Sequence, residues 1–162
     1  MAVNEQRGFT LIELVMVLVL IGILAAFVAP KLGNVTSTKA GSFTDKLRAD
    51  MRYAQDLAMT RNQRYRVYFN TAPASAQGYV VVNDANGNGT WGEAGEIASD
   101  PAGGGNLSVI LNAGQYAGIT VSTPAGGFIE FNSLGVPTAA ATLTVTPGGQ
   151  TVTNTAQTGT VN

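Results

Sequence analysis

The feature that most constrains this chain is an uninterrupted apolar run close to its start. Residues 14–29 read LVMVLVLIGILAAFVA and contain no charged side chain. Between Phe9 and Pro30 the only ionisable residue is Glu13. As a helix that rises about 1.5 Å per residue, this span is about 33 Å long, enough to cross the hydrocarbon core of a bilayer. The sequence therefore predicts one membrane-spanning helix at residues 9–30.

Glu13 is unusual because a carboxylate inside a bilayer is costly, which indicates a function and a cationic partner. Together with Gly8 and the residues Phe9-Thr10-Leu11-Ile12 between them, it resembles the class III signal of type IV pilins and type II secretion pseudopilins. The resemblance implies that a prepilin peptidase removes residues 1–8, cutting after Gly8, and methylates the new terminal amine of Phe9. It also implies that Glu13 neutralises the terminal amine of a neighbouring subunit in a filament.

An ordinary secretory signal and a plain membrane anchor account for the apolar run less well. A secretory signal has small residues at a cleavage site after the run, and here Phe27 and Pro30 lie beside any such site. A plain membrane anchor accounts for the length of the run but leaves Glu13 without a purpose. We therefore prefer the prepilin interpretation.

Composition excludes several classes of function for the rest of the chain. The 162 residues include no Cys and no His, and charged residues make up 12%. These absences remove Cys nucleophiles, Ser-His triads and zinc sites built from Cys or His. The formal net charge of −1 gives no overall attraction to nucleic acid. We therefore expect a structural protein and no enzyme.

An amphipathic helical pattern follows the apolar run. Apolar residues recur at steps of three and four, as expected for one face of a helix, at Phe43, Leu47, Met51, Ala54 and Ala58. We expect Pro30 to kink the helix and not to end it, so that residues 31–62 continue it. Two pairs of opposite charge at i,i+4 are expected on the solvent side, Lys46 with Asp50 and Arg52 with Asp56.

From residue 64 the pattern changes to short alternating segments separated by Gly, Pro or Asn, which is typical of antiparallel strands. The predicted strands are 64–69, 78–82, 107–111, 118–122, 128–131, 142–146 and 150–155. The expected fold class is α+β and pilin-like. A long N-terminal helix, transmembrane in its first half and amphipathic in its second, packs on an antiparallel β-rich head at residues 63–162.

Within the pilin-like proteins the chain is most similar to the minor pseudopilin group GspH/FimT, through residues 47–50, 61–69 and the FNSLGVP segment at 131–137. This resemblance implies a subunit of a secretion pseudopilus or pilus in the bacterial inner membrane, with its head in the periplasm or on a filament. The implied partners are other pilins or pseudopilins, the prepilin peptidase, an inner-membrane assembly platform and secreted cargo.

One loop of the head suggests calcium. Asp84, Asn86 and Asn88 alternate before a glycine, as at the start of an EF-hand loop, and Glu93 supplies a further oxygen ligand. The twelfth position is Gly95, however, where that loop needs an acid. The alternative is a plain β-loop whose Asn-Gly pairs supply positive φ angles, and we favour it. No cofactor is then expected.

Arg61, Arg64 and Arg66 are interleaved with Tyr65 and Tyr68 and suggest phosphate contacts and base stacking on nucleic acid. Some relatives in the resembled group are DNA receptors with a glycine-arginine motif near the C-terminus, but residues 158–162 here contain no arginine. Solvated arginines at a helix end and an edge strand are the alternative that we prefer. Two alternative functions stay open: a DNA-binding minor pilin for DNA uptake, and a membrane-anchored β domain with an unknown ligand.

Four head carboxylates are candidates for a paired acid-base site, and one tryptophan is a candidate contact. The carboxylates are Glu93, Glu96, Asp100 and Glu130. No nucleophile motif or phosphate-binding loop accompanies them, so no catalytic residue is predicted. Trp91 is interpreted as a small hydrophobic plug, with a contact at a filament tip as the alternative.

Overall fold

The structure, a computed structural model, describes residues 9–32, 35–156 and 160–162. It divides into two compact units, the N-terminal part up to Val35 and the head from Thr36 to Asn162. The predicted leader, residues 1–8, lies outside the described residues.

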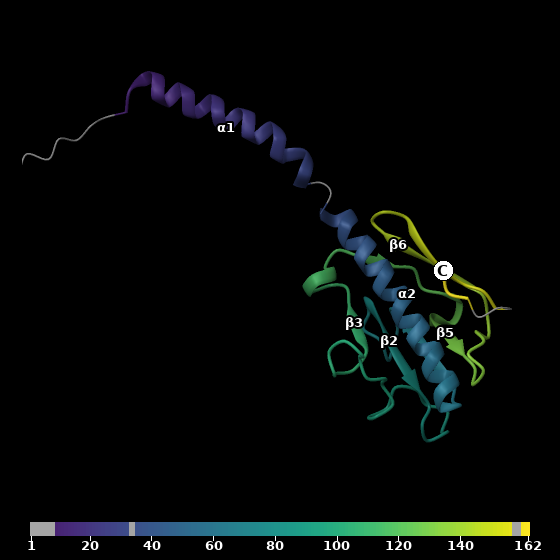
Figure 1. The fold of residues 1–162 in the computed structure, drawn as a ribbon. Helices are drawn as coiled ribbons and strands as arrows, with labels where there is room; N and C mark the ends of the chain where they lie inside the picture. The colour runs from purple at the N-terminus through teal and green to yellow at the C-terminus, as the bar shows by residue number, and fades with distance from the viewer. Residues whose placement is uncertain (1–8, 33–34, 157–159) are drawn as a thin grey trace, which may run out of the picture. The chain divides into compact units, whose positions relative to one another are not determined.

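The N-terminal unit contains one apolar helix, α1, at Leu11–Leu32 (Figure 1). The backbone N–H of Glu13 donates to the hydroxyl of Thr10 over 3.3 Å, which caps the start of the helix. The helix passes through Pro30 without ending there. It is long and apolar enough over Leu11–Val28 to cross a membrane, and none of that span is buried in the structure.

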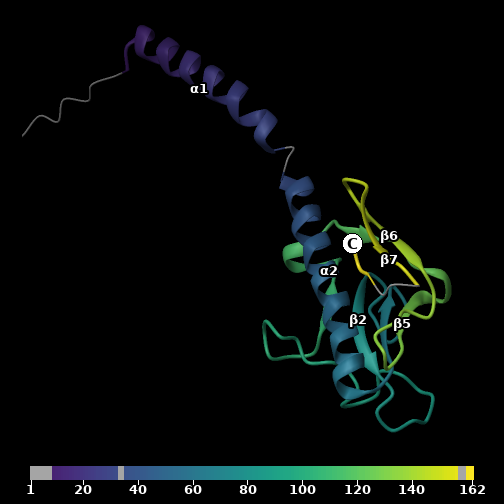
Figure 2. The same ribbon diagram turned by 45° about the vertical axis from the view of Figure 1, so that its right-hand side comes forward.

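The second helix, α2 at Val35–Arg61, packs along the strands of the head (Figures 1 and 2). The predicted apolar stripe is confirmed, because all five of its residues, Phe43, Leu47, Met51, Ala54 and Ala58, are completely buried. Burying this face against the sheets, and not helix propensity alone, stabilises the helix.

The strands form two antiparallel sheets. The first has the order β3-β2-β1-β5, from Ser108–Ile110, Gly78–Asn83, Tyr65–Phe69 and Phe128–Phe131. The second has the order β4-β6-β7, from Thr120–Val121, Ala141–Thr146 and Gln150–Asn154. Short 3-10 turns lie at Gly114–Tyr116 and Ala125–Gly127. The predicted α+β arrangement of a helix on an antiparallel head is confirmed.

The core lies between α2 and the inner faces of both sheets. In β1 the alternation places Tyr65, Val67 and Phe69 inside, all nearly inaccessible to solvent. The Tyr79 ring packs against Phe43 and Phe69 with ring centroids 6.0 Å apart in both cases. The second sheet completes the core with apolar side chains from its inner face, namely Leu143, Val145 and Val152.

Both predictions for the ion pairs of α2 need correction. Asp50 forms the expected pair with Lys46 at 2.9 Å, but it is buried and not on the solvent side. It accepts a hydrogen bond of 2.5 Å from the Tyr79 hydroxyl, so the core draws this carboxylate inward. The Arg52 guanidinium does not pair with Asp56; its Nη2 donates to the Val161 carbonyl over 2.8 Å.

The buried Tyr79 hydroxyl predicts alkaline sensitivity. Burial, followed by the charge and hydrogen bond of Asp50, raises the pKa of Tyr79 well above 10.0. The unfolded chain therefore releases this proton first as pH rises past about 10, and the free energy of unfolding falls from there upward. Melting of the full chain in detergent micelles between pH 8 and pH 11 should show this fall, and Tyr79→Phe should reduce it. An identical decline in the variant would contradict the assignment.

Candidate assembly site and head surfaces

The N-terminal unit carries the residues predicted for processing and assembly. Gly8 lies outside the described residues, and Phe9 is 80% exposed just before the helix begins. Glu13 stands in the first turn of α1, where the partial positive charge of a helix N-terminus favours a carboxylate. An exposed phenylalanine just before α1 and an anionic group in its first turn therefore lie close together along the chain.

The surface of α1 needs a covering that the chain itself does not supply. Every residue from Leu11 to Val28 is exposed, and most of them are large and apolar. Contiguous apolar surface of this size is unstable in water and marks contact with lipid or with other helices. This helix is suited to a membrane and to a bundle of similar helices.

On the head, the arginines and the aromatic residues form one cluster. The Arg66 guanidinium lies 4.0 Å from the ring centre of Trp91 and 4.1 Å from that of Phe128. Its Nε donates to the Glu130 carboxylate over 2.6 Å, and Nη1 donates to the Tyr68 hydroxyl over 3.0 Å. Burial alone would lower the pKa of Arg66, but the bonds to Tyr68 and Glu130 outweigh it and raise that pKa.

This arrangement limits what the arginines can offer to a nucleic acid. The Arg66 guanidinium is already bound by Glu130 and Tyr68 and packs on two aromatic rings. Arg64 lies 3.6 Å from the same Glu130 carboxylate. Arg61 and Arg64 are both exposed to solvent. The nucleic-acid hypothesis stays a prediction, to be tested by a salt-sensitive gel shift. Trp91, by contrast, has a defined role as a half-buried platform for Arg66.

The sequence did not reveal that Glu130 pairs with Arg66. The two residues are direct partners in the register of β1 and β5, on the face turned away from the core. The signal was present in part, because each is the charged residue at an outward position of an apolar strand. What the sequence lacked was the pairing of β1 with β5, which lie far apart along the chain.

The residues predicted to bind calcium lie together, but their side chains form hydrogen bonds with other groups of the same loop. The Asp84 carboxylate accepts from the backbone N–H groups of Asn88 and Gly89, both at 3.0 Å. The side-chain amides of Asn86 and Asn88 both donate to Glu93, at 2.8 and 2.9 Å. Among the described residues there is no group of three acidic, His or Cys side chains arranged for a metal.

This loop yields a direct test of the calcium hypothesis. Asp84→Ala removes two backbone hydrogen bonds, each worth about 1 kcal/mol or more to a charged acceptor, and should lower the melting temperature with or without calcium. If calcium binds, the parent protein should melt higher when the ion is added, and Asp84→Ala should not. A parent protein that melts identically with calcium and with a chelator would exclude the ion.

The four candidate catalytic carboxylates are occupied separately. Glu96 is buried and accepts from the backbone N–H groups of Ala85 and Glu93, at 3.0 and 3.1 Å. Glu130 binds the arginines, and Asp100 accepts from the N–H of Ala102 in its own turn over 2.8 Å. With Glu93, which accepts from Asn86 and Asn88, all four acids take part in local structure, and the structure does not assemble them into one catalytic site.

Comparison with known families agrees with this architecture. Residues 44–160 match the model of the type II transport protein GspH, and residues 3–29 match the prokaryotic N-terminal methylation motif. The GspH match covers most of the chain, from the middle of α2 to the end of the head. Neither a curated protein nor a solved structure matches the chain. The chain therefore belongs to the GspH family of type II transport proteins and is a type II secretion or type IV pilin-like subunit.

Proposed function

We propose that this chain is a minor pseudopilin or pilin that prepilin peptidase cuts between Gly8 and Phe9 and that assembles through its N-terminal helix. The observation that carries the proposal is the apolar helix whose residues 11–28 are all exposed, with Glu13 in its first turn. The match to the N-terminal methylation motif over residues 3–29 supports it. On this account the function is mechanical, and the chain catalyses no reaction.

The proposed sequence of events begins with the precursor in the inner membrane. The chain is anchored by α1, with its head on the periplasmic side. Cleavage exposes the amine of Phe9, which pairs with Glu13 of a neighbouring subunit. Leaving the bilayer is tolerated because packing against other helices hides the apolar surface of α1 again. The head faces outward and contacts cargo or the next subunit.

Cross-linking through single cysteines tests assembly directly, because the natural chain contains no cysteine. Val17→Cys places one thiol on α1, and Thr142→Cys places one on an exposed position of β6 as a matched control. In cells that hold the complete secretion machinery, Val17→Cys should cross-link to cysteine-bearing helices of other pilin-like subunits. The cross-link should disappear when the assembly motor is inactive. Equal cross-linking without the motor would contradict filament assembly.

A further inference from the structure

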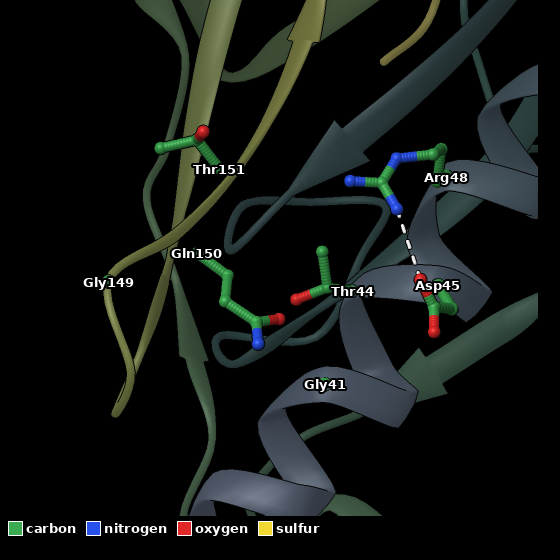
Figure 3. Close-up of a pocket in the computed structure, with 7 residues that line it drawn as sticks. All are labelled: Gly41, Thr44, Asp45, Arg48, Gly149, Gln150 and Thr151. Carbon is green, nitrogen blue, oxygen red and sulfur yellow. Dashed lines mark hydrogen bonds and ion pairs between the residues drawn. The ribbon is translucent and has the colours of Figure 1, made fainter.

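A polar groove of about 450 Å³ lies on the head between α2 and the β6–β7 hairpin (Figure 3). Residues of α2 form one wall, and the turn before β7 together with the first residues of β7 forms the other. The lining residues are Gly41, Thr44, Asp45, Arg48, Gly149, Gln150 and Thr151. Gly41 and Gln150 face each other across the groove, and the Gln150 amide nitrogen is 3.7 Å from where a Cβ on Gly41 would lie, an ordinary contact distance.

Arg48 has hydrogen-bonding capacity left over in this groove. Its Nη1 donates to the Asp45 carboxylate over 3.0 Å, but the Asp45 side chain is 80% exposed. The Nε of Arg48 is buried and has no partner within the part of the chain that the structure describes. A buried guanidinium N–H that lacks an acceptor is unfavourable. The Arg48 side chain as a whole is 28% exposed and lines the groove, so the exposed part of its guanidinium is open to an incoming oxygen. The Gln150 amide extends into the groove beside Thr44 (Figure 3).

The second wall of the groove is an open strand edge. Thr153 of β7 exchanges two backbone hydrogen bonds with Asn162, at 2.8 and 2.9 Å, so its backbone groups point away from β6. The backbone N–H and C=O groups of successive residues point to opposite edges of a strand. The backbone groups of Thr151, two residues before Thr153, therefore point to the same edge as those of Thr153. Thr144, opposite Thr151 in the register, accordingly bonds to Ser122 on its other side. Of the residues described, none bonds to the Thr151 backbone.

We propose that this groove binds an extended peptide segment of a partner protein, which adds to β7 as a further strand and places a carboxylate against Arg48. Unpaired strand edges are templates for strand addition, in which main-chain bonds supply affinity and pockets supply specificity. Val161 and Asn162 already pair with Asn154 and Thr153 on this edge, so the partner extends the same sheet beside Thr151. A carboxylate is the acceptor that matches the planar guanidinium best.

This surface goes beyond the N-terminal helix and does not depend on it. The proposed assembly through α1 would stand if the groove were empty in the filament, and the groove can bind a peptide without any filament. The test therefore uses the full chain in detergent micelles, without other subunits. Failure of peptide binding would leave the assembly proposal untouched.

The probe is an array of ten-residue peptides of varied sequence. Each peptide is made in two versions, one with Asp or Glu at a given position and one with Asn or Gln there. We expect bound peptides to carry Asp or Glu at one fixed position and to bind less tightly as the amide. In solution, methylation of alternate backbone nitrogens in the best peptide should abolish binding to the parent protein, because strand pairing needs those N–H groups. Slower hydrogen exchange of the Thr151 amide should mark the added strand.

Two substitutions on α2 should act in opposite directions. Arg48→Met should weaken binding of the best peptide about thirtyfold or more, whereas Asp45→Asn should strengthen it by removing the competing carboxylate. Lys39→Met removes the same charge from the same helix outside the groove and should leave affinity nearly unchanged. The proposal is overturned if no peptide binds, if acidic and amide peptides bind equally, if methylated peptides bind normally, or if Arg48→Met matches the parent.

Discussion

Replacing Glu13 with alanine should leave cleavage after Gly8 intact and reduce entry of the chain into filaments by about a hundredfold or more. The carboxylate is the ionisable group of an otherwise apolar span. In a packed helical bundle, its removal leaves the terminal amine of a neighbouring subunit buried without a counter-charge. Breaking a buried ion pair in this way costs about 3–5 kcal/mol, and about 1.4 kcal/mol corresponds to a factor of ten.

The measurement is the amount of processed subunit in the sheared filament fraction relative to the membrane fraction. Glu13→Gln should behave like alanine, because the amide carries no charge. Thr10→Val is the matched control, since it removes the cap on the Glu13 N–H but keeps the carboxylate. If Thr10→Val reduces incorporation as strongly as Glu13→Ala, Glu13 acts only at the start of the helix and the pairing is wrong.

Replacing Asp50 with alanine should have the largest effect on the stability of the head, lowering the free energy of unfolding by about 3 kcal/mol. The substitution leaves the Tyr79 hydroxyl without its acceptor at 2.5 Å and Lys46 without its partner at 2.9 Å. Tyr79 is completely buried, so water does not replace the lost bond. Deleting the acceptor is therefore costlier than deleting the donor, and Tyr79→Phe should cost less than half as much.

Urea unfolding of the full chain in detergent micelles measures both variants. Trp91, the single tryptophan of the chain, reports loss of its contact with Arg66 through its fluorescence. Asp56→Ala is the control, because Asp56 lies on the same helix outside the buried set, and it should change stability by less than about 0.5 kcal/mol. An Asp50→Ala protein as stable as Asp56→Ala would contradict the proposed role of the buried carboxylate.

The sequence predicted secondary structure well because local patterns decide it. Apolar steps of three and four define α2, and alternation with Gly and Pro breaks defines the strands of the head. Boundaries moved by a few residues at the ends, as with β4, which is Thr120–Val121 where the sequence predicted a strand at 118–122. These positions depend on which neighbour a strand finds, and a pattern along one chain does not contain that information.

Contacts between distant residues were the part that sequence reasoning missed. Helical spacing placed Asp50 beside Lys46 correctly, but only the packing of β2 under α2 brings the Tyr79 hydroxyl to it. In the same way, Arg66 meets Phe128 and Glu130 through the order of strands in the first sheet. The groove beside Arg48 forms where α2 lies next to the β6–β7 hairpin, and no sequence motif predicts it.

The central claim, that the chain is a processed filament subunit, is tested most directly by its intact mass after extraction from membranes. The protein should be compared between cells with and without an active prepilin peptidase. We expect loss of residues 1–8 and gain of one methyl group on Phe9 only when the peptidase is active. An unchanged N-terminus in both strains would reduce the chain to a tethered β head, and a cut after the apolar run would make it an ordinary secreted protein; either result contradicts the claim.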